Sequence, residues 1–464
     1  MSQFDDKTKA ELIANDKKYV WHHLTQHKVY ENADPAIYVK GEGMRITDIN
    51  GNQFLDAVSG GVWTVNVGYG RQEIVDAVSK QLLDMCYFAN GIGNIPTIQF
   101  SEKLISKMPG LSRVYLSNSG SEANEKAFKI VRQIGNLKHG GKKTGILYRA
   151  RDYHGTTIAT LSAGGQFERR NQYGPFCPGF YEFPDCDTYR SKFGDCEDLG
   201  VKLAMQMEEV ILSIGADELG AVIVEPMTAG GGILIPPAGY YETIQELCKK
   251  YNLLLIVDEV VCGLGRTGKW FGYQHFGIQP DIVTMAKGVA SGYAAISCTV
   301  TTEEVFQDFV NDPTDPDAFF RDISTFGGCT AGPTAALVNM DILENENLLE
   351  NAAAMGDYLL EGLNALKDKH PSVGDVRGKG LFAGVELVKD RTTKEPVSDA
   401  FATQVVGAAK MQGGILIGKT TRSFRELNNT LTLCPALIAT KADIDEIVAG
   451  IDKALTVVEE KFGM

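Results

Sequence analysis

Short apolar runs alternate with segments of helical periodicity from about residue 70 to about residue 330, and this alternation limits the fold more than any other feature. Parallel strands need a crossover connection, which is usually a helix, so the pattern predicts strands joined by helices. We therefore expect an α/β fold in which helices cover both faces of a large, mostly parallel sheet. The clearest candidate strands span 113–116, 145–149, 221–224, 253–257 and 282–285.

The pattern changes near residue 335, and a chain of 464 residues is long enough for more than one domain. We predict an N-terminal arm over 1–65 that packs with the small domain, a large domain over 66–334, and a smaller α+β C-terminal domain over 335–464. A long helical segment over 333–366 is expected to lead into the small domain.

Composition argues against several classes of function. The formal net charge of −14 is unlike that of a nucleic-acid-binding protein, which presents a basic face. The sequence has neither an apolar run of bilayer length nor the apolar core of a signal peptide, so we expect no membrane partner. Nine cysteines without a CxxC pair predict reduced thiols and a cytoplasmic location. His22, His23 and His27 lack acidic or cysteine partners at metal-binding spacing, so we predict no metal site.

Two candidate strands end close to residues that one cofactor chemistry requires. Asp258 ends the apolar run 253–258, and Lys287 follows the run 282–285. Pyridoxal phosphate needs a lysine amine to bind its aldehyde as a Schiff base and a carboxylate to keep its ring nitrogen protonated. Taken alone, each residue has an ordinary alternative: a surface lysine for one and a turn-capping acid for the other.

Two further motifs also follow candidate strands. The segment 118–124 has the Ser-x-x-Glu spacing of a capping box at a helix start, where free N–H groups can bind a phosphate. Tyr153 follows another strand, where its ring could stack on a flat ligand; taken alone, an ordinary half-buried loop tyrosine is the alternative. Since the carboxyl ends of parallel strands meet at one edge of a sheet, we predict that these features form one site with Asp258 and Lys287.

With these residues in view, the chain resembles the class III pyridoxal-phosphate-dependent aminotransferases of fold type I over nearly its full length. The resemblance implies the fold of this family, an aminotransferase activity and pyridoxal 5'-phosphate as cofactor. It also implies a homodimer with shared active sites, and leaves the pairing of dimers into tetramers open. The motifs that carry it lie at 118–124, 153–155, 257–260, 265–268, 285–288 and 324–328.

The resemblance also implies roles for individual residues. Lys287 is expected to bind the cofactor aldehyde and to be the catalytic residue, and Asp258 is expected to pair with the ring nitrogen. Tyr153 is expected to stack on the ring, while the helix start holds the phosphate together with a threonine of the neighbouring subunit. The implied cofactor-binding residues are Gly120, Ser121, Tyr153, Glu225, Asp258, Lys287 and Thr325.

The substrate is expected to contact both subunits. Arg422 is expected to bind its anionic group through two N–H donors, with Arg425 as the alternative. Transaminases for ornithine-like substrates carry a glutamate where this chain has Gly230, so the arginine is expected to stay available for a short anionic substrate. The pocket residues that the resemblance implies are Trp63 and Leu24, together with Tyr87 or Phe88 from the other subunit.

A narrower resemblance concerns the segments 20–28, 57–70 and 320–328, which are similar to those of ω-transaminases that take taurine as amino donor and pyruvate as acceptor. The expected reaction is a ping-pong transfer that yields an aldehyde and L-alanine. β-Alanine, or another ω-amino acid or amine, is the alternative donor. An isomerase or a decarboxylase on the same fold is a further alternative, because a fold does not fix a reaction.

Overall fold

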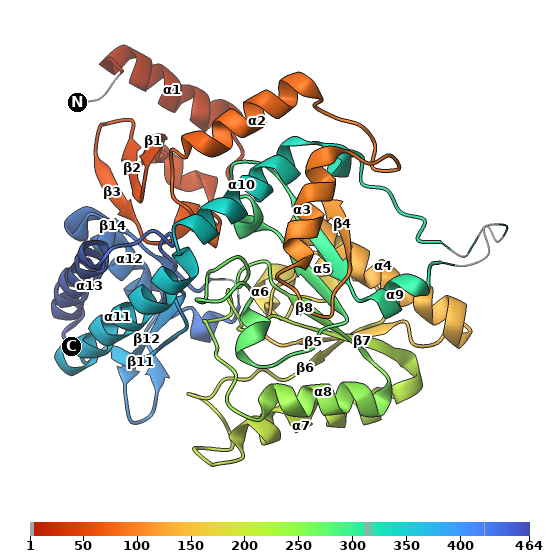
Figure 1. Cartoon of the computed structure of the whole chain (residues 1–464). Coiled ribbons are helices and arrows are strands. Elements are labelled where there is room, and N and C mark those ends of the chain that lie inside the picture. The colour runs from red at the N-terminus through yellow and green to blue at the C-terminus, as the bar shows by residue number, and fades with distance from the viewer. Residues whose placement is uncertain (1–3, 311–313, 315–316, 318, 422) are drawn as a thin grey trace.

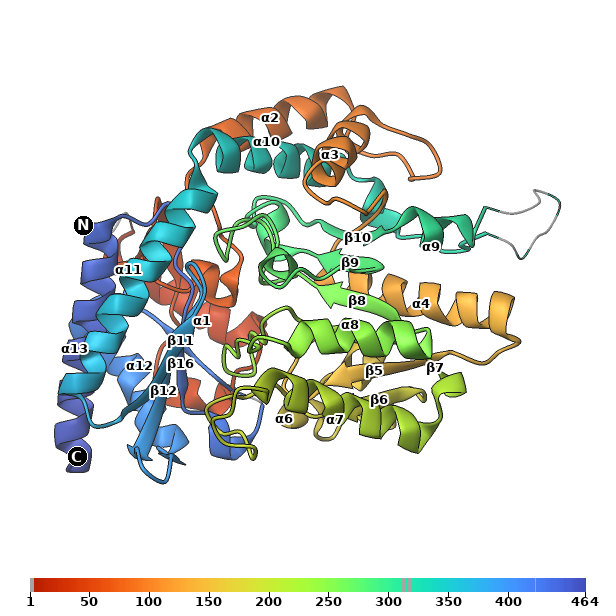
Figure 2. The ribbon, with the colours of Figure 1, turned by 60° about the horizontal axis from the view of Figure 1, so that its bottom comes forward.

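A seven-stranded sheet forms the centre of the computed structural model, in which residues 4–310, 314, 317, 319–421 and 423–464 are described. Its strands are β4 (Arg113–Ser117), β5 (Gly145–Arg149), β6 (Phe180–Phe183), β7 (Leu219–Val224), β8 (Leu254–Asp258), β9 (Ile282–Met285) and β10 (Ser297–Thr301). The strand order is β4-β10-β9-β8-β7-β5-β6, and Figure 2 shows the strands from β10 to β6 stacked in this order. The pairs from β9 to β6 are parallel, whereas β10 runs antiparallel to both of its neighbours.

Helices cover both faces of this sheet because its central strands are apolar on both sides. In β7, Ala221 and Ile223 belong to one apolar cluster together with α4 (Gly120–His139). Val222 and Val224 belong to a second cluster with α7 (Leu199–Ile214) and α8 (Tyr240–Tyr251), which lie side by side in Figure 1. Side chains alternate along a strand, so one continuous apolar run supplies both clusters. The predicted α/β fold is confirmed.

The predicted helical segment over 333–366 consists of two helices, α10 (Ala331–Asn345) and α11 (Leu348–Lys369). Asn347 has a φ of 51°, in the left-handed region, where a right-handed helix cannot continue. α10 packs against α2 (Gln72–Asp84) and α3 (Ile95–Ile105), and α11 leads to the smaller C-terminal sheet (Figure 2). The break lets one segment serve both parts of the molecule.

The C-terminal sheet has the strand order β11-β12-β16-β15, formed by β11 (Val373–Gly378), β12 (Ala383–Asp390), β16 (Thr430–Leu433) and β15 (Gly418–Lys419). The two-residue strand β13 (Glu395–Pro396) pairs with β12. The helices α12 (Asp399–Gly413) and α13 (Lys441–Phe462) pack against each other beside this sheet. This mixture of strands and helices is the smaller α+β unit of the predicted fold class.

The N-terminal segment joins the C-terminal part of the chain. It begins with α1 (Asp6–Tyr19), followed by β1 (Tyr38–Glu42), β2 (Arg45–Asp48) and β3 (Gln53–Asp56). β14 (Ile415–Leu416) pairs with β3 in parallel, with Ile415 opposite Leu55. Figure 1 shows both chain ends on the side of these smaller sheets.

None of the helices in the described ranges has both the length and the apolar character that a bilayer span requires. Within the same ranges, no group of three or more histidine, cysteine or acidic side chains is arranged to hold a metal ion. His22 instead bonds to Asp16, with 2.7 Å between Nε2 and Oδ1. All nine cysteines are free thiols.

Candidate active site

A cavity of about 440 Å³ opens at the carboxyl ends of β7, β8 and β9. This edge of a parallel sheet is where open α/β folds place ligands. The predicted site residues that line the cavity are Leu24, Trp63, Gly120, Ser121, Tyr153, Glu225, Asp258 and Lys287. The structure therefore brings together residues that lie far apart in the sequence.

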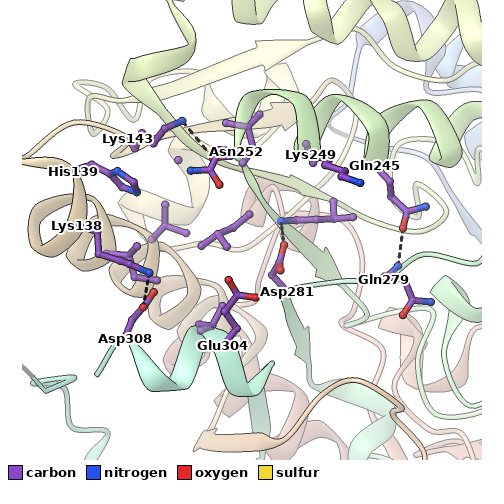
Figure 3. Close-up of a pocket in the computed structure, with 18 residues that line it drawn as sticks. Lys138, His139, Lys143, Gln245, Lys249, Asn252, Gln279, Asp281, Glu304 and Asp308 are labelled. Atoms are coloured by element: carbon purple, nitrogen blue, oxygen red, sulfur yellow. Dashed lines mark hydrogen bonds and ion pairs between the residues drawn. The ribbon is translucent and has the colours of Figure 1, made fainter. Parts of the chain in front are cut away.

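A second cavity, of about 600 Å³, lies at the opposite edge of the sheet, where β7 and β8 begin. Figure 3 shows that Lys138, Lys143 and Asp281 in it each bind another side chain or the backbone. Lys138 pairs with Asp308 at 2.6 Å, and Asp281 accepts a bond from the Leu255 N–H at 2.7 Å. The residues that line this cavity include none of the predicted site residues of the described part of the chain, so we place the active site in the first cavity.

Lys287 begins the short helix η5 (Lys287–Val289), is separated from β9 by Ala286, and is half-buried. Its φ of 36° lies in the left-handed region, which a residue with a side chain adopts at a cost of about 1–3 kcal/mol. Burial lowers the pKa of its amine, and the negative charges of Asp258 and Glu225 oppose this effect. A lowered pKa increases the share of neutral amine, which is the form that acts as a nucleophile or a base.

Asp258 ends β8 and is almost fully buried, and three donors hold its carboxylate. Oδ2 accepts hydrogen bonds from Asn124 Nδ2 and His154 Nδ1, both at 2.8 Å. Oδ1 accepts a bond from the Val260 N–H at 3.0 Å. Donors of this kind stabilise a carboxylate in its charged form, so a fixed negative charge lies at the edge of the cavity.

Asn124 and His154 are buried members of this network that the sequence analysis did not assign. Asn124 Oδ1 accepts a bond from Thr284 Oγ1 at 2.7 Å, and its Nδ2 also donates to the His154 carbonyl at 2.7 Å. Both residues lie inside motifs that the sequence analysis singled out, 118–124 and 153–155. The signal available in the sequence for both residues was their place, as polar residues without an assigned role, inside these motifs.

Glu225 follows β7 and is buried, and its carboxyl group binds the backbone. Oε1 accepts a bond from the Tyr153 N–H at 2.8 Å, and Oε2 accepts one from the Ala229 N–H at 2.9 Å. Burial raises the pKa of this carboxyl group, and the charges of Asp152 and Asp258 act in the same direction. Glu225 therefore fixes the backbone that presents the Tyr153 ring to the cavity.

The N-terminus of α4 reaches the same cavity through Gly120 and Ser121. Ser119 caps the helix as predicted, because its Oγ accepts a bond from the Glu122 N–H at 3.2 Å. In a capping box the Glu122 carboxylate would accept a bond from the N–H of Ser119. It instead accepts one from the N–H of Asn118, the residue before the cap, at 2.6 Å. A Cβ added at Gly120 would lie 3.0 Å from the Val260 side chain, so glycine keeps the helix start open.

These features fit pyridoxal phosphate. A helix N-terminus suits a phosphate, the ring of Tyr153 suits a flat heterocycle, and the buried Asp258 carboxylate suits a protonated ring nitrogen. His154 Nε2 is buried and has no hydrogen-bond partner in the described structure. A buried polar atom of this kind calls for a partner from a bound group or an ordered water.

Trp63 and Leu24 form part of the cavity wall on the side of the smaller sheets. Both have positive φ values, 63° and 52°, which are strained conformations for residues with side chains. The Trp63 ring lies edge-on to the ring of Phe382, with 6.0 Å between the ring centroids. Strain of this kind is common at ligand sites, where the surrounding structure holds a residue in place.

Three predicted residues, Tyr87, Phe88 and Thr325, lie outside the described lining of the cavity and close to one another. Thr325 begins the short helix η6 (Thr325–Gly328), and the Phe88 N–H donates to the Gly328 carbonyl at 3.3 Å. Tyr87 pairs with Cys329 in an isolated bridge. All three predicted residues are exposed.

The predicted anion-binding arginine, Arg422, lies outside the described residues, and Arg425 begins the short helix η7 (Arg425–Leu427). Gly230 lines the cavity. Two cations that the sequence analysis did not single out, Arg169 and Lys419, line it as well. Arg169 lies in a helix of four residues, which is too short to show helical periodicity in a sequence.

Comparison with known proteins defines the class. The class III aminotransferase family matches residues 27–455, and the chain belongs to this family. Aminotransferases of this class use pyridoxal phosphate, in agreement with the residues around the cavity. Over 456 residues the chain is 82% identical to the taurine–pyruvate aminotransferase of Bilophila wadsworthia, with 98% of this chain and 99% of that relative covered.

Solved structures of related enzymes have the same fold. An aminotransferase of Bacillus anthracis is similar with a TM-score of 0.92 and 40% identity, covering 98% of this chain and 100% of that one. The ω-transaminase of Pseudomonas jessenii in complex with PMP is similar with a TM-score of 0.92 and 33% identity, covering 97% and 99% of the two chains. The family and the fold that the sequence motifs implied are therefore confirmed.

Proposed function

We propose that this chain transfers the amino group of taurine to pyruvate, in two half-reactions that form sulfoacetaldehyde and L-alanine. The observation that carries the proposal is the 82% identity, over nearly the whole chain, to a taurine–pyruvate aminotransferase. The cavity supports it, because about 440 Å³ accommodates a cofactor together with a small substrate.

Pyridoxal phosphate supplies, when bound, an aldehyde that takes up the amino group and a ring that accepts electrons. We assign its binding to residues whose positions fit each of its parts. Lys287 would hold the aldehyde, Asp258 would pair with the ring nitrogen, and Tyr153 would stack on the ring. Gly120 and Ser121 would bind the phosphate at the start of α4. Glu225 supports this arrangement through its bond to the Tyr153 N–H, at 2.8 Å.

Lys287 also moves a proton in each half-reaction. Its Nζ would take a proton from the carbon of taurine that bears the amino group and pass it to the cofactor, and in the second half-reaction it would move a proton from the cofactor to C2 of pyruvate. The lowered pKa of the buried amine favours the neutral form that the first step needs. Proton transfer by a positioned side chain contributes a factor of about 10²–10⁴ to a rate.

The sulfonate of taurine and the carboxylate of pyruvate take turns at one anion site. Gly230 supports this part of the proposal, because it places no acidic side chain on the cavity wall to compete for a nearby cation. We keep Arg422 as the proposed anion-binding arginine, with Arg425 as its alternative. A guanidinium suits both substrates, since two of its N–H groups can bind two oxygens of either anion.

We further propose that two copies of the chain form a dimer with shared active sites. The exposed Tyr87 and Phe88 lie beside η6, the short helix that begins with Thr325. The segment of Tyr87 and Phe88 and the segment of Thr325 are therefore placed to reach the active-site cavity of a neighbouring subunit together. Further large apolar side chains are exposed in the adjoining stretches of sequence, and exposed apolar groups of this kind mark protein interfaces. These side chains, with their exposed fractions, are Ile92 (60%), Ile95 (70%), Ile323 (73%) and Phe326 (66%).

Subunit mixing tests the shared site. Lys287→Ala removes the amine of a chain's own site, and Thr325→Asp places a negative charge where the partner's phosphate is proposed to bind. Each variant alone is expected to have little activity. A mixture that has exchanged subunits is expected to recover activity, because one of the two sites in a mixed dimer then combines the intact Lys287 with the partner subunit's Thr325. Mixed dimers that stay inactive contradict shared sites.

A donor panel tests the reaction itself. The enzyme is incubated with pyruvate and with taurine, β-alanine or benzylamine, and alanine is measured. Taurine is expected to give the highest kcat/KM, and alanine is expected to form only when pyruvate is present. A higher kcat/KM with β-alanine or benzylamine than with taurine contradicts the proposed donor. Repeated turnover of a donor without pyruvate, beyond one molecule per active site, indicates an isomerase or a decarboxylase instead.

A further inference from the structure

Arg169 belongs to the short helix α6 (Phe167–Arg170), and its half-buried side chain lines the active-site cavity. Its guanidinium carbon lies 4.6 Å from the centroid of the Tyr153 ring, within the range of a cation–π contact. Its Nε donates to Gln166 Oε1 at 2.6 Å. The ring and the amide together set the position and the plane of the guanidinium.

Gln166 is itself fixed, because it is 1% exposed and its Nε2 donates to the Arg151 carbonyl at 3.2 Å. A Cβ added at Gly230 would lie 2.8 Å from the same Nε2. Gln166 and Gly230 both line the cavity, so the support of Arg169 extends to the wall that we assign to the substrate. A buried amide that makes two hydrogen bonds preorganises the side chain that it holds.

The charge of Arg169 reaches the reacting amine. Burial is the main cause of the lowered pKa of Lys287, and the positive charge of Arg169 acts in the same direction. Arg169 therefore places a positive charge near enough to act on the Lys287 amine, from a fixed position over the Tyr153 ring.

We propose that Arg169 recognises the anionic head group of the substrate, the sulfonate of taurine in one half-reaction and the carboxylate of pyruvate in the other. This inference rests on the proposed function, and it adds a specificity-determining residue from outside the 422–425 segment. The planar N–H groups of a guanidinium match the oxygens of both anions. Because Tyr153 and Gln166 already restrict the side chain, less conformational entropy is lost when the anion binds.

Binding of an unreactive anion tests this role without turnover. Ethanesulfonate has the head group of taurine but no amino group, so calorimetry on the pyridoxal-phosphate holoenzyme measures recognition of the anion alone. Arg169→Gln is expected to weaken its binding by about 10- to 100-fold, the range of one charge-assisted contact. Arg169→Lys is expected to lose less, because the ammonium keeps the charge but not the planar pair of donors. Unchanged binding in both variants overturns the proposal.

A control variant and a kinetic measurement separate recognition from support of the fold. Arg170 is the next residue of α6, and its Nη1 donates to the Tyr148 hydroxyl at 2.6 Å, so Arg170→Gln changes the same helix away from the cavity. Arg169→Gln is expected to raise the KM for taurine more than it lowers kcat, whereas Arg170→Gln is expected to leave the binding of ethanesulfonate unchanged. Equal losses in the two variants assign Arg169 a structural role and overturn the proposal.

The outcome for Arg169 stays separate from the outcome for the donor. If the wild-type enzyme uses β-alanine and not taurine, the proposed donor is wrong. Propionate then replaces ethanesulfonate as the unreactive anion, because it has the carboxylate of β-alanine without the amine. Weaker propionate binding in Arg169→Gln supports the role of Arg169, and unchanged binding overturns it.

Discussion

His154 Nδ1 lies 2.8 Å from Oδ2 of Asp258, and both side chains are almost completely buried. Asn124 donates to the same oxygen, also at 2.8 Å. Two N–H donors on one buried oxygen hold the carboxylate in place at the end of β8 and stabilise its negative charge. A nearby negative charge favours the protonated form of a ring nitrogen, so this network provides what pyridoxal phosphate requires.

Asp258→Asn is expected to slow the half-reaction with taurine by at least about 100-fold, a loss typical of a missing electrostatic contact in an active site. The amide has no net charge and cannot favour a cationic ring. Stopped-flow absorbance under single-turnover conditions measures this rate, and thermal unfolding checks that the variant is folded. A variant that reacts at the wild-type rate shows that another group performs this role.

Gly155→Ala is expected to weaken cofactor binding and to lower the free energy of unfolding by about 1–3 kcal/mol. Gly155 has a φ of 147°, and an added Cβ would lie 2.6 Å from Ser121 Oγ and would also press on Thr160. Ser121 must then move from the position that we assign to a phosphate contact. Fluorescence titration of the apoenzyme with pyridoxal phosphate gives the affinity.

The matched control for this change is Gly407→Ala. Gly407 is exposed on α12, and an added Cβ meets nothing within 4 Å. Alanine there is expected to leave cofactor binding unchanged and to raise the free energy of unfolding by up to about 1 kcal/mol, since alanine favours a helix over glycine. Equal cofactor affinities in the two variants contradict the close fit between Gly155 and Ser121.

Gly230→Glu is expected to lower kcat/KM for taurine by about tenfold or more relative to Gly230→Gln, because a carboxylate on the cavity wall repels the sulfonate and competes for nearby cations. The two variants are matched in size, and both press on Gln166, since a Cβ at this position lies 2.8 Å from its Nε2. Their difference therefore isolates the charge. Similar values for the two variants mean that Gly230 lies away from the anion site.

His275 is expected to make stability depend on pH below neutrality. Burial, followed by the charges of Lys269 and Lys379, lowers its pKa to about 4, so the folded protein keeps the ring neutral. The unfolded chain binds a proton below about 6.5, so stability is present above that pH and is lost as the pH falls from about 6.5 through about 4. The ring is only half-buried, and solvent reduces the size of the effect.

Chemical denaturation at several pH values checks this dependence. The free energy of unfolding of the wild type, taken relative to His275→Gln, is expected to decrease between about pH 6.5 and about pH 4. The glutamine can still donate to the Thr267 carbonyl, which the ring nitrogen approaches at 3.0 Å, but it does not titrate. Parallel curves for the two proteins show that His275 keeps its ordinary pKa.

Long apolar runs and strand-end motifs were the predictable part of the structure. β5 and β9 have the bounds expected from the sequence, and Asp258 and Lys287 lie at the strand ends that the apolar runs predicted. β10 gave no such signal, because three of its five residues are serine or threonine, and an antiparallel strand inside a parallel sheet has no sequence pattern of its own.

Other features depend on contacts that a sequence does not display. The end of α10 depends on Asn347, whose φ of 51° follows from packing, although asparagine tolerates that conformation. Arg169 and Gln166 are adjacent to the active site only because α6 returns to the end of β5, and no periodicity marks so short a helix. His154 was visible beside Tyr153, but its bond to Asp258 joins residues 104 positions apart.

The covalent bond between Lys287 and the cofactor is the central claim, and borohydride reduction of the holoenzyme tests it most directly. Reduction makes the bond permanent, and peptide mapping by mass spectrometry then locates the modified side chain. The account predicts the label on the peptide that contains Lys287 and no label in the Lys287→Ala variant. A label on another lysine, or an unlabelled wild-type protein, contradicts it.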